Sequence, residues 1–187
     1  KAYGTKVAFN LAEDQSPNLV KRWISTGSVQ LDYIIANRRN GGVPEGRIIE
    51  ISGMPSTGKS HIAFAMARNT QQMGGLVVYI DTECAVPVEK LSSMGIDVRK
   101  RFVYCDTHCT EEVFSIIEST ILKAKSLMSK DIPILVVWDS VAATSLMYMS
   151  FVLSVVGNNI RTLVLTENIL YQVKAYRENR NSEHDMS

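Results

Sequence analysis

The sequence predicts an α/β domain with a mostly parallel sheet flanked by helices. Five short apolar runs rich in β-branched residues indicate buried strands, at 47–52, 76–81, 101–105, 133–139 and 161–166. Their apolar residues are nearly continuous rather than alternating, as in strands covered on both faces of a parallel sheet. Helical patterns lie between most of these runs, and this alternation of strands and helices is typical of α/β architecture.

Three segments have the pattern of helices. Residues 59–72 contain neither Gly nor Pro, and the run ends at "MGG". Residues 111–128 place apolar side chains on one stripe, with Thr110 as a plausible cap and Glu111 and Glu112 near the positive end of the helix dipole. A third helix is predicted at 146–156.

Composition limits the functional classes only weakly. The formal net charge of the 187 residues is +1, so binding to nucleic acid or to a membrane would need a local patch. No apolar run approaches the length of a membrane span, and the segment "KAYGTKVAFN" has no signal-peptide core. Three cysteines without a C-x-x-C pair suit a reducing compartment, and we expect a cytoplasmic protein with no membrane partner.

The cysteines also raise the question of a metal site. His108 lies beside Cys109 and near Cys105, and these residue types can bind a metal ion. No further ligand cluster accompanies them in the sequence, so roles in the core or in loops are favoured.

Residues 53–60, "GMPSTGKS", have the spacing of a phosphate-binding loop (P-loop). They follow a predicted strand and open a predicted helix, which is the context that this motif needs. The glycines let successive backbone N–H groups face phosphate oxygens, and the helix N-terminus adds partial positive charge. Lys59 is expected to reach the β- and γ-phosphates, and the Ser60 hydroxyl to ligate Mg²⁺. The predicted nucleotide contacts are Gly53, Met54, Pro55, Ser56, Thr57, Gly58, Lys59, Ser60 and His61.

Three carboxylates follow other predicted strands. "ILVVWDS" places Asp139 at a strand end, as a second residue on the Mg²⁺ side, and "VVYIDTEC" supplies Asp81 and Glu83. Ligands of open α/β sheets bind beyond the carboxyl ends of the strands, so these three groups should converge on the γ-phosphate. Glu83 is the candidate base that orients the attacking water, although an exposed loop carboxylate would have the same spacing.

These residues, in this order, resemble the RecA-type DNA recombinases. The resemblance is carried by "KAYGTKVAFNLAED", by "ISTGSVQLD", by the lead "GGVPEGR" into the P-loop strand, and by "YIDTEC", "LSSMGID" and "VVWDSVAA". It covers roughly residues 1–144. It implies a RecA-type P-loop ATPase core at 47–170. Residues 1–46 would be an N-terminal linker or polymerisation segment together with the entry to the core.

The resemblance also implies a function. Such proteins are DNA-dependent ATPases that use ATP and Mg²⁺, bind single-stranded and double-stranded DNA as a self-associated helical filament, and promote homologous pairing and strand exchange in recombination and repair. Nucleotide binds between adjacent subunits, Glu83 activates the water, and the sensor at the strand end falls at Asn168 or, less favoured, at Glu167. Catalytic roles therefore go to Glu83, Lys59 and Asn168, and metal ligation to Ser60 and Asp139.

The sequence departs from this family after "DSVAATS". About twenty residues of a first DNA-binding loop are expected between Ser145 and Leu146. Either the protein lacks this loop or the sequence omits it, and the second is favoured because such loops are mobile. Residues 171–187 are polar and are predicted to be a loop or tail. Bacterial members of the family have a Thr pair in place of Ser60-His61 and Gln in place of Asn168. These differences suggest a divergent, phage-like member.

Two alternatives remain open. A RecA-fold ATPase could regulate or remodel a partner without strand exchange, which would account for the departures after Asp139. A small-molecule kinase could use the same P-loop, but the sequence shows no arginine-rich lid segment and "ISTGSVQLD" has no role in a kinase.

Overall fold

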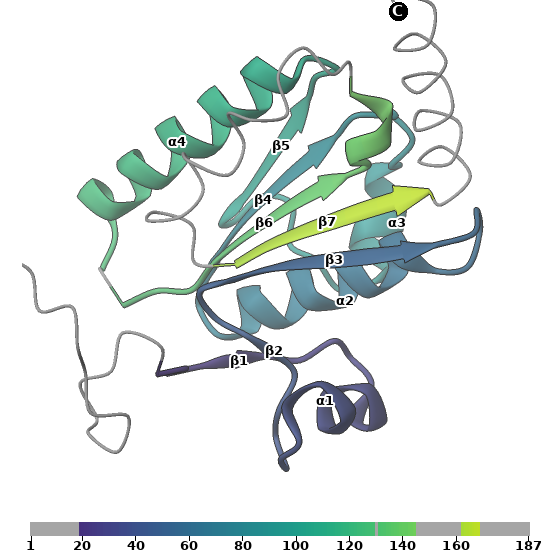
Figure 1. Ribbon diagram of the computed structural model, residues 1–187. Helices are drawn as coiled ribbons and strands as arrows, with labels where there is room; N and C mark the ends of the chain where they lie inside the picture. The colour runs from purple at the N-terminus through teal and green to yellow at the C-terminus, as the bar shows by residue number, and fades with distance from the viewer. Residues whose placement is uncertain (1–18, 130, 145–161, 169–187) are drawn as a thin grey trace, which may run out of the picture.

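A five-stranded parallel sheet forms the centre of the fold (Figure 1). The structure, a computed structural model, describes residues 19–129, 131–144 and 162–168, the last as backbone only. Expectations for 1–18, for the helix at 146–156, for the DNA loop near 145/146 and for 171–187 lie outside these residues. The sheet order is β3-β7-β6-β4-β5, from β3 (Arg47–Gly53), β7 (Thr162–Asn168), β6 (Ile134–Asp139), β4 (Leu76–Asp81) and β5 (Phe102–Asp106). The α/β class and all five predicted strands are confirmed. Burial on both faces is confirmed for β4 and β6 and is wrong for β3 and β5, which lie at the two ends of the described sheet and are partly exposed.

Helices cover both faces of the sheet. On one face lie α2 (Lys59–Gln72) and α3 (Val88–Ser93), and on the other lies α4 (Thr110–Leu127) (Figure 1). The predicted bounds of α2 are confirmed. Thr110 as the cap of α4 is wrong by one residue, because Thr110 is buried in the first turn and Cys109 is the N-cap. A short 3-10 helix, η1 (Val141–Ala143), follows β6.

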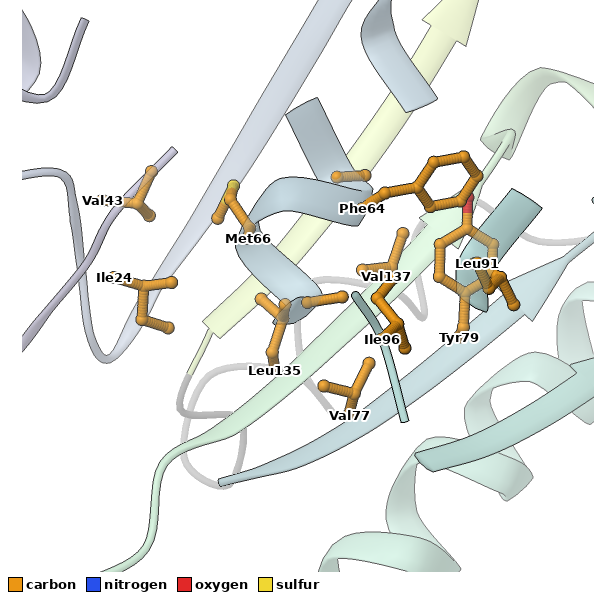
Figure 2. Close-up of a cluster of buried hydrophobic side chains, with 12 residues drawn as sticks. Ile24, Val43, Phe64, Met66, Val77, Tyr79, Leu91, Ile96, Leu135 and Val137 are labelled. Carbon is orange, nitrogen blue, oxygen red and sulfur yellow. The ribbon is translucent and has the colours of Figure 1, made fainter. Parts of the chain in front are cut away.

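The alternation of side chains along β4 and β6 produces two cores. Val77, Tyr79, Leu135 and Val137 pack under α2 and α3, as Figure 2 shows for this cluster. The intervening residues face α4 instead. That second core contains Leu76, Val78, Ile80, Ile134, Val136 and Trp138 from the strands and Val113, Phe114, Ile117, Ile121 and Ala124 from α4. Burial on both faces explains the nearly continuous apolar runs of β4 and β6.

A small unit of α1 (Val29–Ala36), β1 (Trp23–Ile24) and β2 (Val43–Pro44) precedes the main sheet, and the sequence pattern did not predict these elements. Buried Asp32 organises the unit. Its carboxylate accepts hydrogen bonds from the Ser25 hydroxyl at 2.5 Å, and from the Thr26 backbone N–H and hydroxyl, each at 2.7 Å. The spacing of "STG" and "LD" in the sequence thus has a structural reason. These residues close the loop before α1 onto its first turn.

Membrane-spanning potential is absent from the described helices: within the ranges that the structure describes, none is long and apolar enough to cross a bilayer.

Candidate functional site

The loop 53–60 joins the end of β3 to the start of α2. Gly58 has φ +97°, a left-handed conformation that side chains disfavour, and it serves as the N-cap of α2 with no side-chain cap. Ser56 also has a positive φ, +61°. A Cβ atom on Gly53 would lie 3.0 Å from the Thr57 hydroxyl. The first N–H groups of α2 therefore face out of an open, largely exposed loop, which is the arrangement that binds anions at helix N-termini.

Lys59 folds back over this loop. Its Nζ donates to the carbonyl oxygens of Gly53 at 3.1 Å and Met54 at 2.9 Å. The Thr57 hydroxyl also donates to the Met54 carbonyl, at 2.8 Å. The ammonium is thereby held at the mouth of the loop, where a phosphate bound to the N–H groups of α2 would lie close to its positive charge.

The carboxyl ends of all five strands form a continuous row, and the P-loop follows the first of them, β3. In the strand pairing, Gly53 is opposite Asn168, Asp139 is opposite both Thr166 and Asp81, and Asp81 is opposite Asp106. This row brings the P-loop and the predicted carboxylates to one edge of the sheet, where ligands of open α/β sheets bind.

Asp139 is half-buried at this edge and is oriented by a buried tyrosine. The Tyr79 hydroxyl donates to Asp139 Oδ2 at 2.6 Å. Burial, and then the charge of Asp139, raise the pKa of Tyr79 far above its ordinary value, so that the phenol stays a neutral donor. The peptide bond between Asp139 and Ser140 is cis.

Asp81 has a different environment from Asp139. It is buried, and its carboxylate accepts from the backbone N–H groups of Glu83 at 3.1 Å and Val86 at 3.0 Å, and from the Tyr104 hydroxyl at 2.8 Å. Each oxygen accepts at least one of these bonds. Asp81 therefore holds the loop after β4 in place.

Glu83 is exposed on that loop, and its Oε1 accepts a hydrogen bond from the Ser140 hydroxyl at 2.8 Å. Thr82 ties the same loop to the end of β6, because its hydroxyl donates to the Ser140 carbonyl at 2.6 Å. Ser140, the residue after Asp139, thus holds the carboxylate of the candidate base in position.

One cavity of about 290 Å³ joins these groups. Ser60, Asp81, Glu83 and Asp139 all line it, together with Phe64, Ala85, Val86, Pro87 and Lys90. A water molecule occupies about 30 Å³ in the liquid, so the space suits a hydrated ion and phosphate groups rather than a whole nucleotide. A hydroxyl and a carboxylate oxygen are ligands that Mg²⁺ prefers, and Ser60 and Asp139 supply both at this cavity.

Two predicted site residues are less fully described. His61 is exposed in the first turn of α2. The backbone of Asn168 lies opposite Gly53, and that of Glu167 opposite Ser52. The predictions for their side chains stay predictions.

A larger cavity of about 690 Å³ lies elsewhere, between α1 and the C-terminal end of α2. Trp23 lines it, with Arg38 lying over the indole ring at 5.7 Å from its centroid. It lies at the opposite end of α2 from the P-loop, and the carboxylates of the strand ends are not among its lining residues. The chemistry therefore favours the smaller cavity as the site for the phosphate groups and the metal ion of a nucleotide.

Sequence reasoning missed three supporting residues: Tyr79, Tyr104 and Ser140. Each donates a hydrogen bond to a carboxylate at the site. The signal that could have found the tyrosines is a phenol two residues before a strand-end aspartate, since residues i and i+2 share one face of a strand. This spacing occurs in Tyr79-Ile80-Asp81 and Tyr104-Cys105-Asp106. The phenol then bonds to the aspartate of a neighbouring strand.

Comparisons with known proteins match most of the chain to one family. The family model described as the RecA N-terminal domain matches residues 1–148. The curated "Protein RecA" of Malacoplasma penetrans is 39% identical over 129 residues, which are 69% of this chain and 36% of that protein. "Protein RecA" of Campylobacter hominis is 34% identical over 143 residues, 76% of this chain and 37% of that protein. The chain spans about a third of the length of these relatives.

Proposed function

The chain belongs to the RecA family, and we propose that it is the ATP-binding and ATP-hydrolysing part of a DNA recombinase. The observation that carries the proposal is the single cavity at which Ser60, Glu83 and Asp139 meet beside the P-loop. A P-loop, a magnesium-side carboxylate and a second carboxylate for water are the parts that ATP hydrolysis needs.

The proposed roles follow from position. The N–H groups of 53–60 and the Lys59 ammonium would hold the phosphates, and Ser60 and Asp139 would hold Mg²⁺, which neutralises phosphate charge. Glu83 is proposed as the base that orients water, with Ser140 holding its carboxylate. Asn168, opposite Gly53 in the sheet, is proposed as the sensor of the γ-phosphate.

The same proposal extends to the larger assembly. Residues 47–170 would be the ATPase core, 1–46 the linker and polymerisation segment with the lead into the core, and 171–187 a loop or tail. The protein would bind single-stranded and double-stranded DNA as a filament and promote strand exchange. ATP would stabilise the DNA-binding state, and hydrolysis would release it.

Paired substitutions at Lys59 and Glu83 test the site. Lys59→Ala should abolish binding of Mg·ATP, because the phosphates lose the positive charge of the Lys59 ammonium. Glu83→Gln should bind Mg·ATP normally and lose turnover by about a hundredfold or more, since only activation of the water is removed. Fluorescent-nucleotide titration and phosphate release measure the two effects. If Glu83→Gln hydrolyses ATP at the unaltered rate, Glu83 is not the base.

A further inference from the structure

Three exposed side chains gather at the carboxyl ends of β4 and β5, next to the predicted nucleotide site. They are Cys84 on the loop after β4, Asp106 at the end of β5 and His108 two residues later. One potential ligand atom of each lies within 4.8 Å of the other two. We propose that Cys84, Asp106 and His108 bind a divalent transition-metal ion of the zinc class.

The distances suit a small tetrahedral site. Cys84 Sγ lies 3.6 Å from His108 Nε2. Two ligands at the usual zinc–sulfur and zinc–nitrogen lengths, about 2.3 Å and 2.0–2.1 Å, are about 3.6 Å apart in a tetrahedral arrangement. The Cys84 thiol donates a hydrogen bond to Asp106 Oδ1, with sulfur and oxygen 2.8 Å apart. An ion that takes the place of this proton lengthens the sulfur–oxygen separation, which two exposed side chains can accommodate.

The donor set selects the class of metal. One sulfur, one imidazole nitrogen and one carboxylate oxygen suit zinc and its neighbours in the transition series, whereas Mg²⁺ prefers oxygen ligands alone. Three protein ligands leave a fourth position for water. Binding forms a bond from sulfur to the metal and releases the thiol proton to solvent.

The local charge also favours a cation. Asp106 accepts the hydrogen bond of the Cys84 thiol, and the charge of Asp81 also acts on this thiol, so that negative charge at this position attracts a divalent ion.

Both loops are held in position before any ion binds. Asp81 accepts from the backbone N–H groups of Glu83 and Val86, on either side of Cys84. On the other loop, the buried Thr107 donates to Glu112 at 2.5 Å and accepts from the backbone N–H of Cys109 at 3.3 Å. Ligands held by such bonds need little reorganisation to bind a metal. An ion would bridge the loop that carries Glu83 to the end of β5.

Titration with Zn²⁺ alone tests the proposal. Nucleotide is left out because ATP itself binds zinc, and the result is therefore independent of the proposed ATPase function. Calorimetry should show about one zinc ion bound per chain, and Cys84→Ser, Asp106→Asn and His108→Gln should each weaken binding about tenfold or more. Cys109→Ser is the matched control: a cysteine next to His108 whose thiol donates to Glu111 instead. Co²⁺ provides a second readout, a sulfur-to-cobalt absorption band that requires Cys84.

Cys84, Asp106 and His108 are exposed and Cys109 is half-buried, and circular dichroism checks that each variant folds. Loss of the cobalt band in Cys84→Ser, with the band retained in Cys109→Ser, supports the site. The proposal is overturned if the unaltered protein binds no zinc at 0.1 mM, a concentration about a hundredfold above a micromolar Kd. It is equally overturned if the three substitutions leave zinc affinity unchanged, or if Cys109→Ser weakens it as much as Cys84→Ser.

Discussion

At the scale of single residues, the site depends on neutral hydrogen-bond donors that fix charged acceptors. Tyr79 and Ser140 each donate to a carboxylate that has a proposed role, Asp139 and Glu83 respectively. Tyr104 donates to Asp81, which holds the loop of Glu83 through backbone N–H groups. A carboxylate fixed in this way needs little rearrangement when a metal ion or water arrives.

Substitution of Tyr79 by Phe should affect both stability and magnesium use. The change removes a hydrogen bond to the charged Asp139 and should lower the free energy of unfolding by about 1–3 kcal/mol. Asp139 is then less well oriented, so half-maximal nucleotide binding should need more Mg²⁺. Tyr104→Phe is the matched control, because Tyr104 bonds to Asp81 instead. Equal Mg²⁺ requirements in the two variants would contradict the role given to Tyr79.

The reactivity of the Cys84 thiol should depend on pH in a defined direction. The hydrogen bond to Asp106 raises the pKa of Cys84 to about 11, and only the thiolate reacts with iodoacetamide. In a variant that keeps Cys84 as its one cysteine, alkylation should be slow at pH 8 and accelerate towards pH 11. Asp106→Asn should move this rise to lower pH, because the negative charge that opposes ionisation is removed. A rise near the ordinary thiol pKa in both proteins would contradict the hydrogen bond.

At the scale of elements, the apolar periodicity of the sequence predicted the strands and helices whose apolar side chains form the core. The five strands and α2 were predictable because each is a nearly continuous apolar run or an uninterrupted helical pattern. The unit of α1, β1 and β2 was not, because its strands are two residues long and its organising contact is a buried carboxylate. The sequence features that could have indicated α1 were its two caps, Ser28 at the N-terminus and the left-handed Asn37 at the C-terminus, with eight helical residues between them. The site was predictable as a set of strand-end residues, whereas the tyrosine donors depend on which strands are neighbours.

The apolar stripe of α4 provides a direct test at this scale. Ile121 is 1% exposed in the core under α4, and the adjacent Leu122 is 56% exposed. Ile121→Ala should lower the free energy of unfolding by about 2–5 kcal/mol, through lost burial and a residual cavity. Leu122→Ala should change it by no more than about 0.5 kcal/mol. Urea unfolding measures both values, and a comparable loss in the two variants would mean that α4 packs through another face.

At the scale of the whole molecule, the parallel sheet gathers distant parts of the sequence at one edge. The P-loop follows β3, Glu83 follows β4 and Asp139 ends β6, although β7 lies between β3 and β6 in the sheet. Because every strand runs in the same direction, all their carboxyl ends meet on one side (Figure 1). Under the proposed function, replacing ATP by ADP at this edge would change the contacts at the ends of several strands and in the segments that follow them.

The proposal that this edge is the ATP switch of a DNA recombinase is tested most directly by the rate of ATP hydrolysis with and without single-stranded DNA. We expect DNA to raise the rate, and Glu83→Gln to lower the stimulated rate by about a hundredfold or more while Mg·ATP still binds. Binding without turnover would then separate the nucleotide site from the chemistry. An unaltered protein that binds and hydrolyses ATP at the same rate with and without DNA would contradict the recombinase function.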